Sequence, residues 1–358
     1  MAKGIGRNGE LFRQICDPGY LMRCTRRAAR GKRHKRDVSG FLLNLEPNCF
    51  ELAKSLATEV WNPGAYKSFW IHDPKRRLIS AAPFADRVVH QALVGILEPH
   101  FERRFIFHSY ACRRGKGTHR ALRQAVQWSR QYRYVLKGDI AKFFPSMDHE
   151  VVKACLRSVI HDRSFLDVME RVVDRSNPQE YVQLWFSGDD LLTPLTRRVG
   201  LPIGNLTSQF LANVVLDRLD HEITDRWGAG AYLRYCDDFL VFADDKDALW
   251  ETRGRIEQAL AGLRLKLHAR KGGVHSCEAE VPFLGFTVQK GRVRLGGRSI
   301  RRATLRLRKL HNLVLAQQIA PQRLSASVCA WLSHAGQATG KGLQRRVLAR
   351  AGVGACLG

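Results

Sequence analysis

Three aspartates stand in this chain where a metal-dependent reaction could be built. Asp139 ends an apolar run, YVLKGD, and Asp237 and Asp238 lie between two further apolar runs, AYLRY and FLVFA. Such runs are typical of buried strands, and we expect them to join one antiparallel sheet with the carboxylates at one edge. Because adjacent strand residues point to opposite faces, Asp237 and Asp238 can share a site only if a tight turn breaks the alternation.

Three converging carboxylates repel one another unless cations lie between them. Oxygen ligands of this kind suit Mg²⁺. Two such ions could activate an attacking 3′-hydroxyl and stabilise a leaving pyrophosphate. A single aspartate at a strand end is usually a solvated turn residue, but three of them inside apolar strands favour a catalytic site. We therefore expect two Mg²⁺ ions as cofactors, with Mn²⁺ as the alternative metal.

The composition is that of a globular protein that meets a polyanion. The chain has 358 residues, of which 45% are apolar and 26% charged, enough for two or three lobes with sizeable cores. Lys and Arg (59) exceed Asp and Glu (33) by 26, which favours nucleic acid as the partner. A large positive net charge is also found on proteins that do not act on nucleic acids, so the charge does not identify a reaction.

Several classes of protein are disfavoured by what the sequence lacks. No apolar run reaches the roughly 18 residues of a membrane span, and the first residues have no apolar signal core, so we expect a cytoplasmic protein without membrane contact. The nine cysteines include no C-x-x-C pair, and the thirteen histidines show no H-E-x-x-H spacing. Neither a disulfide framework nor a structural zinc site is predicted.

The remaining pattern predicts the elements that position the acids. A basic segment at 23–36 reads as a solvated arm or loop, and 283–295 as a hairpin. A second hairpin is predicted from SFWIHD and RRLISA, with a basic tip between them. Helical spacing is found at 41–60 with an interruption at Pro47, at 85–101 with an end at Pro99, and at 118–132, 149–195, 206–227, 248–263 and from 298 onward.

Five segments resemble the motifs of reverse transcriptases, in the family's order. YCDD (235–238) is similar to the Tyr-x-Asp-Asp box, and DIAKFFPSMDH (139–149) to the first-aspartate motif. The others are PKRRLISAAPFADRVVHQAL (74–93), GLPIGNLTSQFLANVVLD (200–217) and FLGF (283–286). The resemblance spans roughly residues 40 to 335. It implies an α+β, right-hand polymerase fold with fingers, a palm of antiparallel sheet plus helices, and a helical thumb.

The domain boundaries follow from this resemblance and from the change of composition near Gly296. We expect a basic N-terminal extension over 1–40, fingers over 41–132, and a palm over 133–296 that contains an insertion around 150–200. A helical thumb is expected over 297–358.

The resemblance also implies roles for individual residues. Asp139, Asp237 and Asp238 are the expected metal ligands, together with the backbone carbonyl of Ile140. Lys271 matches the lysine that protonates the departing pyrophosphate, a general-acid role. Lys266 or Arg270 is the alternative for that role.

A nucleotide-binding group is implied next. Lys75, Arg76 and Arg77 lie in the fingers hairpin, where a guanidinium suits a triphosphate, so Arg76 or Arg77 is favoured over Lys75. Phe144 matches the aromatic gate beneath the sugar, which selects deoxynucleotides, whereas Phe143 is expected in the core.

Ile203 and Gly204 are expected to line the pocket that holds the base and sugar. Ile203 stands where other members present a glutamine amide. The loss of that hydrogen bond leads to the hypothesis of lower fidelity.

Contacts to the primer and template are implied for two further segments. Tyr235 and Cys236 are expected near the primer terminus. Arg301 and Arg302 belong to the basic helices that would follow the phosphates and sugars of the RNA–DNA hybrid.

The segment from Ile203 to Gln209 is similar to that of the diversity-generating retroelement enzymes, which copy a template RNA with errors at adenines. This resemblance implies template RNA, cDNA primer and product, dNTPs and a small basic accessory protein oligomer as partners. The alternatives are a stand-alone or phage-defence bacterial reverse transcriptase, and a noncatalytic nucleic-acid-binding module that retains the fold. Group II intron enzymes resemble the palm, but no zinc-ribbon or nuclease motif follows, so DNA cleavage is not expected.

Overall fold

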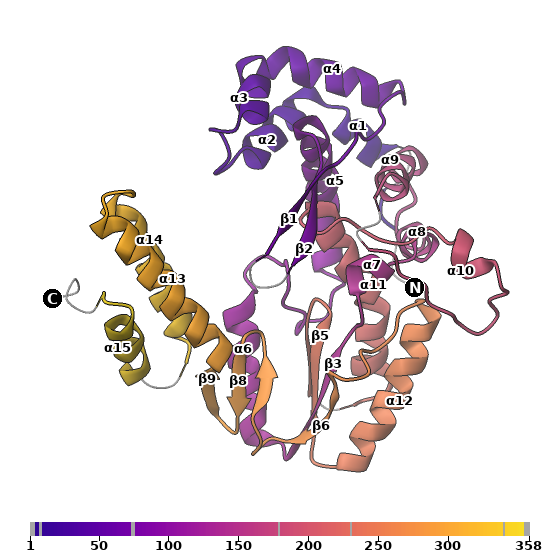
Figure 1. Cartoon of the computed structure of the whole chain (residues 1–358). Coiled ribbons are helices and arrows are strands. Elements are labelled where there is room, and N and C mark those ends of the chain that lie inside the picture. Colours follow the sequence, from indigo (N-terminus) through magenta and orange to yellow (C-terminus); the bar gives the residue numbers. More distant parts are fainter. Residues whose placement is uncertain are drawn as a thin grey trace. The chain divides into compact units, whose positions relative to one another are not determined.

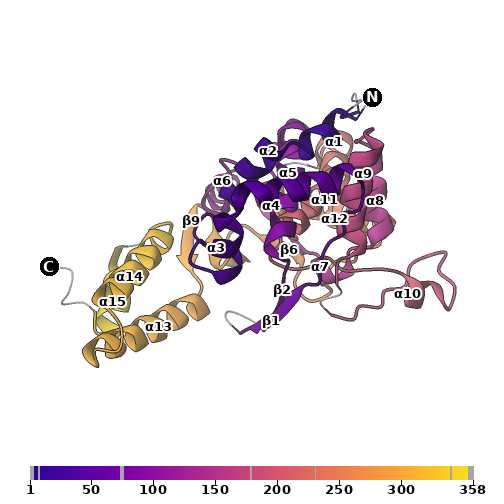
Figure 2. The same ribbon diagram turned by 90° about the horizontal axis from the view of Figure 1, so that it is seen from above.

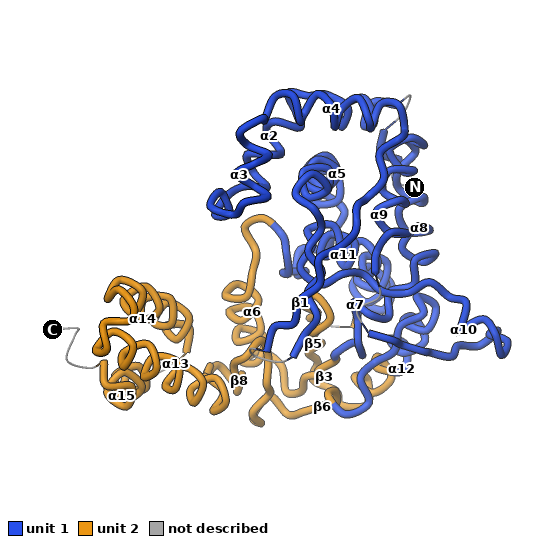
Figure 3. The backbone as a smooth tube through the Cα atoms, turned by 45° about the horizontal axis from the view of Figure 1, so that its top comes forward, with its two compact units in different colours: residues 1–113, 139–228, 254–270 blue, residues 114–138, 229–253, 271–358 orange. Residues whose placement is uncertain are grey.

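The computed structural model describes residues 4–6, 9–72, 76–177, 180–229, 231–338 and 341–353. The chain forms two compact units, each built from segments that are distant in sequence (Figure 3). The first unit contains residues 1–113, 139–228 and 254–270, and the second contains residues 114–138, 229–253 and 271–358.

The first unit is mainly helical. The long helices α5 and α11 lie in its interior, where α5 packs against both α2 and α11. Its helices are α1 (Glu10–Ile15), α2 (Pro18–Ala28), α3 (Arg36–Leu43), α4 (Leu45–Ala57), α5 (Phe84–Glu102), α7 (Phe143–Ser146), α8 (His149–Arg157), α9 (Arg163–Asp174), α10 (Thr193–Thr196), α11 (Leu206–His221) and the π-helical turn η1 (Glu222–Arg226). The predicted hairpin is present as β1 (Lys67–Ile71) and β2 (Arg77–Ala81), which pair antiparallel.

The basic segment at 23–36 is not a free arm throughout, which corrects the sequence prediction. Its first part belongs to α2, where Leu21 and Cys24 are buried while Arg23 and Arg27 are exposed. Asp17 caps the helix by accepting hydrogen bonds from two backbone amides of the first turn. Helix α2 packs against α4 and α5 (Figure 1). Because its apolar residues are buried there, the exposed arginines belong to a fixed helix.

Two prolines do not end helices where the sequence pattern predicted. The break in the segment 41–60 falls at Asn44, and Pro47 lies in the first turn of α4, where a missing N–H costs nothing. Helix α5 continues through Pro99 to Glu102 because Phe101 is buried against the ring of Phe210, 5.2 Å away between centroids. Tertiary packing therefore overrides the local signal.

The second unit is organised around a four-stranded sheet in the order β4-β5-β3-β6. Its strands are β3 (Tyr134–Asp139), β4 (Ala231–Tyr235), β5 (Asp238–Ala243) and β6 (Gly273–Ser276). Helix α6 (Thr118–Gln131) packs against β4 and β5. Helix α12 (Lys246–Gly262) begins in this unit and ends in the first.

Gly138 allows β3 and β5 to pack closely. A Cβ atom at this position would stand 2.0 Å from Cζ of Phe239, whose side chain is buried. We predict that Gly138→Ala lowers the free energy of unfolding by about 1–3 kcal/mol, because the ring or the strand must shift. Urea unfolding with Gly254→Ala as control measures this. Gly254 lies in α12 with open space around it, so that exchange should not destabilise.

The hairpin predicted at 283–295 is present, and a further strand that begins just before this segment makes a three-stranded antiparallel sheet. Its strands are β7 (Val281–Phe283), β8 (Phe286–Gln289) and β9 (Arg292–Leu295). The chain then enters α13 (Gly297–Leu315), α14 (Pro321–Ala335) and α15 (Lys341–Arg350), which lie together (Figure 2). These helices have their own small core, formed by Leu307, Leu324, Val328 and Leu348 among others.

Candidate functional site

The turn between β4 and β5 presents the aspartate pair. Tyr235 pairs with Asp238 across the hairpin, so only Cys236 and Asp237 lie in the turn. Cys236 has a φ of 59°, a left-handed conformation that is unfavourable for a side chain with a Cβ. Arg234, which is wholly buried, stabilises this turn by donating a hydrogen bond from Nη1 to the Cys236 carbonyl at 3.2 Å. The turn breaks the strand alternation, as the sequence analysis requires.

The neighbouring strand β3 fixes which face carries the acids. Gly138 faces the Phe239 ring, so alternation places Lys137 and Asp238 on the opposite face of the sheet. An ion pair confirms this placement, since Lys137 Nζ is 3.7 Å from Asp238 Oδ1. Asp139, the last residue of β3, is two residues beyond Lys137 and belongs to the same face by the same alternation.

The described residues contain no cluster of three or more His, Cys, Asp or Glu side chains arranged to hold a metal ion. Asp139 and Asp238 therefore share a sheet face, and Asp237 lies in the adjoining turn, without a closed ligand set. Carboxylates at one strand end and on the adjoining turn are chemically suited to Mg²⁺. Their role as ligands stays a prediction.

The residues after Asp139 are held by an adjacent chain segment in the first unit. The Asp139 carbonyl accepts a hydrogen bond from the His268 amide at 2.7 Å, and the Ala141 amide donates to the Lys266 carbonyl at 2.8 Å. Ile140 lies between these bonds with its side chain buried. This pairing fixes the backbone of the residue whose carbonyl was predicted as a ligand.

The candidates for the proton donor differ in their surroundings. The Lys266 ammonium lies 5.2 Å from the centre of the Phe186 ring, a cation–π contact. Lys271 is exposed and comes two residues before Gly273, which pairs with Lys137 in the β3–β6 ladder. Lys271 therefore precedes β6 at the sheet end where β3 finishes, and its role as proton donor stays a prediction.

A pocket of about 390 Å³ in the first unit brings together three of the predicted nucleotide-binding residues, Arg76, Arg77 and Ile203. The pocket is also lined by Trp70, Leu78, Pro145 and Glu180. Lys75, the third basic residue of that prediction, lies outside the described residues. The two arginines supply positive charge at a wall of the pocket, and Ile203 supplies an apolar surface.

Phe144 and Gly204 lie next to residues that line this pocket. Phe144 is half-buried and precedes Pro145, whereas Phe143 is buried. Gly204 has a φ of 103°, which a residue with a side chain rarely adopts. The backbone conformation alone therefore favours glycine at position 204, in addition to any contact with a nucleotide.

His149 fastens the segment that carries Phe144 to the segment that carries Ile203. Its Nε2 is 2.9 Å from the Gly200 carbonyl, and burial lowers the pKa of the imidazole, which favours a neutral ring that donates from Nε2. The Leu201 amide also donates to the Phe144 carbonyl at 2.9 Å. These bonds join the two segments beside the pocket, and His149, the last residue of the motif at 139–149, was assigned no role from the sequence.

Trp70 is a pocket residue that sequence reasoning missed, because it stands in an apolar strand pattern. The Arg76 guanidinium lies 4.2 Å from the centre of its ring. Trp70 is 49% exposed, so this ring serves as a platform for Arg76 more than as core. The cross-strand neighbour of Trp70 is Leu78, which also lines the pocket.

If the pocket binds a dNTP, as the resemblance implies, Trp70→Ala should raise the apparent KM for dNTP about two- to fivefold, because Arg76 loses a cation–π contact of about 0.5–1 kcal/mol. Steady-state primer extension measures this. The matched control is Trp250→Ala, which removes a similarly exposed tryptophan with Arg253 5.3 Å from its ring, on α12. An equal change in both variants would contradict a role for Trp70 in the pocket.

The predicted primer and template residues lie in the second unit. The Tyr235 hydroxyl accepts a hydrogen bond at 3.1 Å from Thr118 at the start of α6, a contact that the sequence did not indicate. Cys236 is half-buried. Arg301 and Arg302 are exposed on α13, one turn or more before its buried Leu307.

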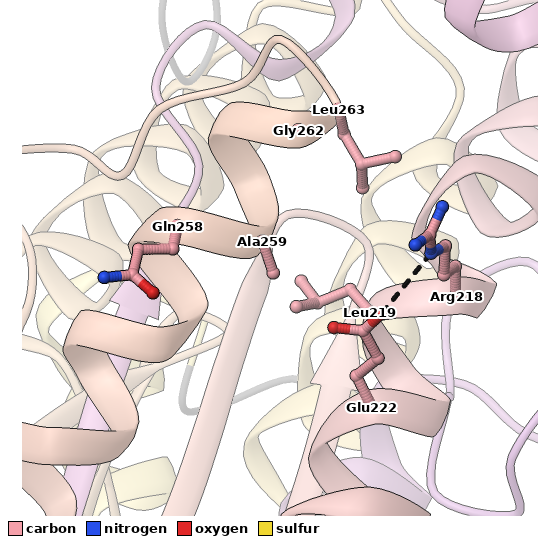
Figure 4. A pocket seen from close by; sticks show the side chains of 7 residues that line it. All are labelled: Arg218, Leu219, Glu222, Gln258, Ala259, Gly262 and Leu263. Atoms are coloured by element: carbon pink, nitrogen blue, oxygen red, sulfur yellow. Dashed lines mark hydrogen bonds and ion pairs between the residues drawn. The ribbon is translucent and has the colours of Figure 1, made fainter. Parts of the chain in front are cut away.

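A second pocket, of about 240 Å³, lies between α11, η1 and α12 (Figure 4). Arg218 and Glu222 line it and form an ion pair at 3.3 Å. None of the predicted site residues belongs to this pocket. It therefore adds nothing to the candidate site.

Comparison with known proteins supports the motif analysis. The family model described as reverse transcriptase (RNA-dependent DNA polymerase) matches residues 71–288, more than half of the chain. The chain belongs to the reverse transcriptase family. The α+β class and the right-hand polymerase fold expected for this family are thereby confirmed.

The chain is similar to several curated proteins over part of their length. It is 38% identical to nuclear intron maturase 1, mitochondrial, of Arabidopsis thaliana over 97 residues, which are 26% of this chain and 14% of the maturase. It is 24% identical to protein YkfC of Escherichia coli over 260 residues, 62% of this chain and 65% of YkfC. The chain thus covers less than two thirds of either relative.

Among solved structures, the chain is similar to apo telomerase from Candida tropicalis truncated from the C-terminal domain. The TM-score is 0.48 at 11% identity, covering 69% of this chain and 59% of that one. No helix among the described residues is long and apolar enough to cross a membrane.

Proposed function

We propose that this reverse transcriptase family member is an active RNA-directed DNA polymerase that makes cDNA from a template RNA. The observation that carries the proposal is the two-residue turn, which sets Asp237 beside Asp238, next to a strand that ends in Asp139 on the face of Asp238. In a chain with this excess of positive charge, acids grouped in this way are better explained by cation binding than by a contribution to fold stability. The noncatalytic alternative gives no reason for them to stand together.

Asp139, Asp237, Asp238 and the Ile140 carbonyl would hold the divalent ions, Mg²⁺ or Mn²⁺. When bound, these ions supply activation of the primer 3′-hydroxyl and stabilisation of the departing pyrophosphate. Lys271 would hold a proton near that leaving group. The rest of the site binds and orients the substrates.

The pocket of the first unit would bind the incoming dNTP. Arg76 and Arg77 suit the triphosphate, because a guanidinium donates two hydrogen bonds in a fixed fork. Phe144 would exclude a 2′-hydroxyl, and Ile203 and Gly204 would face the base and sugar. Trp70 is added to this group through its contact with Arg76.

The second unit would bind the primer and template. Tyr235 and Cys236 would lie near the primer terminus, and Arg301 and Arg302 would contact the backbone of the hybrid. Binding through phosphates falls steeply as salt rises. A flat dependence of log Kd on log salt would contradict this part of the proposal.

Within the reverse transcriptase family, we propose that the chain is the error-prone enzyme of a diversity-generating retroelement, and that it works with a small basic accessory protein oligomer. The support is the segment from Ile203 to Gln209, in which Ile203 stands where other members have a glutamine. An intron maturase is the second candidate, favoured by the similarity to the Arabidopsis maturases. A stand-alone or phage-defence enzyme is a third.

Primer extension on an adenine-containing RNA template with four dNTPs and Mg²⁺ tests these proposals, with the products sequenced. Extension establishes the polymerase. Errors concentrated opposite adenine support the diversity-generating type, whereas accurate products favour the maturase or stand-alone types. Failure of the wild-type chain to extend any primer, alone or with its cognate RNA, would refute the polymerase proposal.

We predict that Ile203→Gln lowers misincorporation opposite template adenine by up to about tenfold. An amide that hydrogen-bonds the correct nucleotide adds selectivity, and about 1.4 kcal/mol corresponds to a factor of ten. Sequencing of cDNA measures the error spectrum. Ile203→Leu is the control, since it changes the side-chain shape without an amide, and an unchanged spectrum in the glutamine variant would count against the hypothesis.

A further inference from the structure

Lys137 is a charged residue of β3 that none of the proposed roles uses. Its side chain is only 14% exposed, and its ammonium makes two contacts. Nζ donates a hydrogen bond to the Pro282 carbonyl at 2.5 Å and lies 3.7 Å from Oδ1 of Asp238. Lysine is seldom buried without such partners, so the two contacts define where the charge is held.

The three elements joined by this ammonium belong to one unit. Lys137 lies on β3, Asp238 is the first residue of β5, and Pro282 is the middle residue of β7. Strand β7 leads directly into the FLGF segment (283–286). The ammonium therefore connects the carboxylate to the start of the sheet that precedes α13.

The register of the sheet leaves the lysine little freedom. Gly138 is packed against Phe239, which fixes β3 beside β5 and directs Lys137 to the face of Asp238. Asp238 is itself only 19% exposed. Water screens such a pair less than a surface pair, so the charges influence each other strongly.

We propose that Lys137 is a positioning residue that holds the Asp238 carboxylate, ties it to β7, and sets how strongly the aspartates attract a divalent cation. The inference rests on the proposed polymerase function. It adds a specific determinant of metal affinity and of primer placement. The side chain acts through Asp238 and Pro282 and takes no part in the bonds that form or break.

Loss of this charge has two consequences of opposite sign. Without the ammonium, the carboxylates attract Mn²⁺ or Mg²⁺ more strongly, because a neighbouring positive charge has been removed. Without the link to Pro282, Asp238 and the turn that follows its cross-strand partner Tyr235 are held less firmly, so the proposed primer contacts of Tyr235 and Cys236 are placed less well. A residue with only a structural role would lower stability without tightening metal binding.

The test uses the full chain and Lys137→Met, which keeps an unbranched apolar stem and removes the ammonium. Mn²⁺ binding is measured from the EPR signal of free Mn²⁺, and primer extension gives KM for the primer–template. We expect Mn²⁺ to bind at least about threefold more tightly and KM for the primer–template to rise about threefold or more. Lys137→Arg, which keeps the charge, should restore both values to within about twofold of wild type.

Two further variants identify the source of the effect. In an Asp238→Asn background, Lys137→Met should change Mn²⁺ binding much less, because the carboxylate nearest to the ammonium has been neutralised. Lys290→Met removes an exposed lysine paired with Glu278 and should leave Mn²⁺ binding unchanged. Lys137→Gln is measured if the methionine variant does not fold.

Unchanged or weaker Mn²⁺ binding in folded Lys137→Met would overturn the proposal, as would the same tightening in the Asp238→Asn background. The binding arm does not need polymerase activity. If the wild-type chain fails to extend a primer, the proposed function fails, while EPR still decides whether Lys137 controls cation affinity at Asp238.

Discussion

Asp238→Ala and Asp237→Ala should each reduce primer extension by at least about 10³-fold. A carboxylate that holds a catalytic cation contributes several kcal/mol of transition-state stabilisation, and about 1.4 kcal/mol corresponds to each factor of ten. Primer extension with an RNA template and Mg²⁺ measures the loss. The turn offers no other carboxylate that could replace either one, since it contains only Cys236 and Asp237 before β5 begins at Asp238.

The control for this prediction is Asp247→Ala. Asp247 is an exposed acid in the first turn of α12, a few residues after the end of β5, and it lies outside the proposed site. Its replacement should leave extension within about twofold, since surface substitutions of this kind change little. Variants of Asp237 and Asp238 that retain wild-type rates would show that the fold serves binding alone.

The second large effect is expected for Arg234. This side chain is wholly buried on β4 and donates to the carbonyl of Cys236, in the turn that carries the aspartates. Arg234→Met should lower the free energy of unfolding by about 1–3 kcal/mol, because loss of the guanidinium leaves the groups that it hydrogen-bonds unsatisfied. Thermal unfolding should show a midpoint lowered by several degrees.

Arg294→Met is the matched control, because Arg294 is exposed on β9 and pairs with Glu280 at 3.1 Å. A surface pair of this kind contributes about 0–1 kcal/mol. If Arg234→Met were as stable as Arg294→Met, the buried arginine would not be what supports the turn.

The sequence indicated most strands and long helices, but local signals failed where tertiary packing opposed them. Pro99 was expected to end a helix that in fact continues and buries Phe101. The basic segment at 23–36 was read as an arm, because its arginines outnumber the apolar residues beneath them. In each case the deciding contacts come from residues distant in sequence.

The sequence alone determined the family and the identity of the candidate acids, because five motifs in a fixed order leave few alternatives. It also indicated that a tight turn must lie between AYLRY and FLVFA. Only the tertiary structure revealed Lys137 between Asp238 and Pro282, Arg234 beneath the turn, Trp70 beside Arg76, and Thr118 at Tyr235. These partners are joined by burial and register across the sheet and the hairpin. When a lysine, an arginine or a tryptophan stands in a strand pattern, the neighbouring sequence does not indicate which distant residue it will contact.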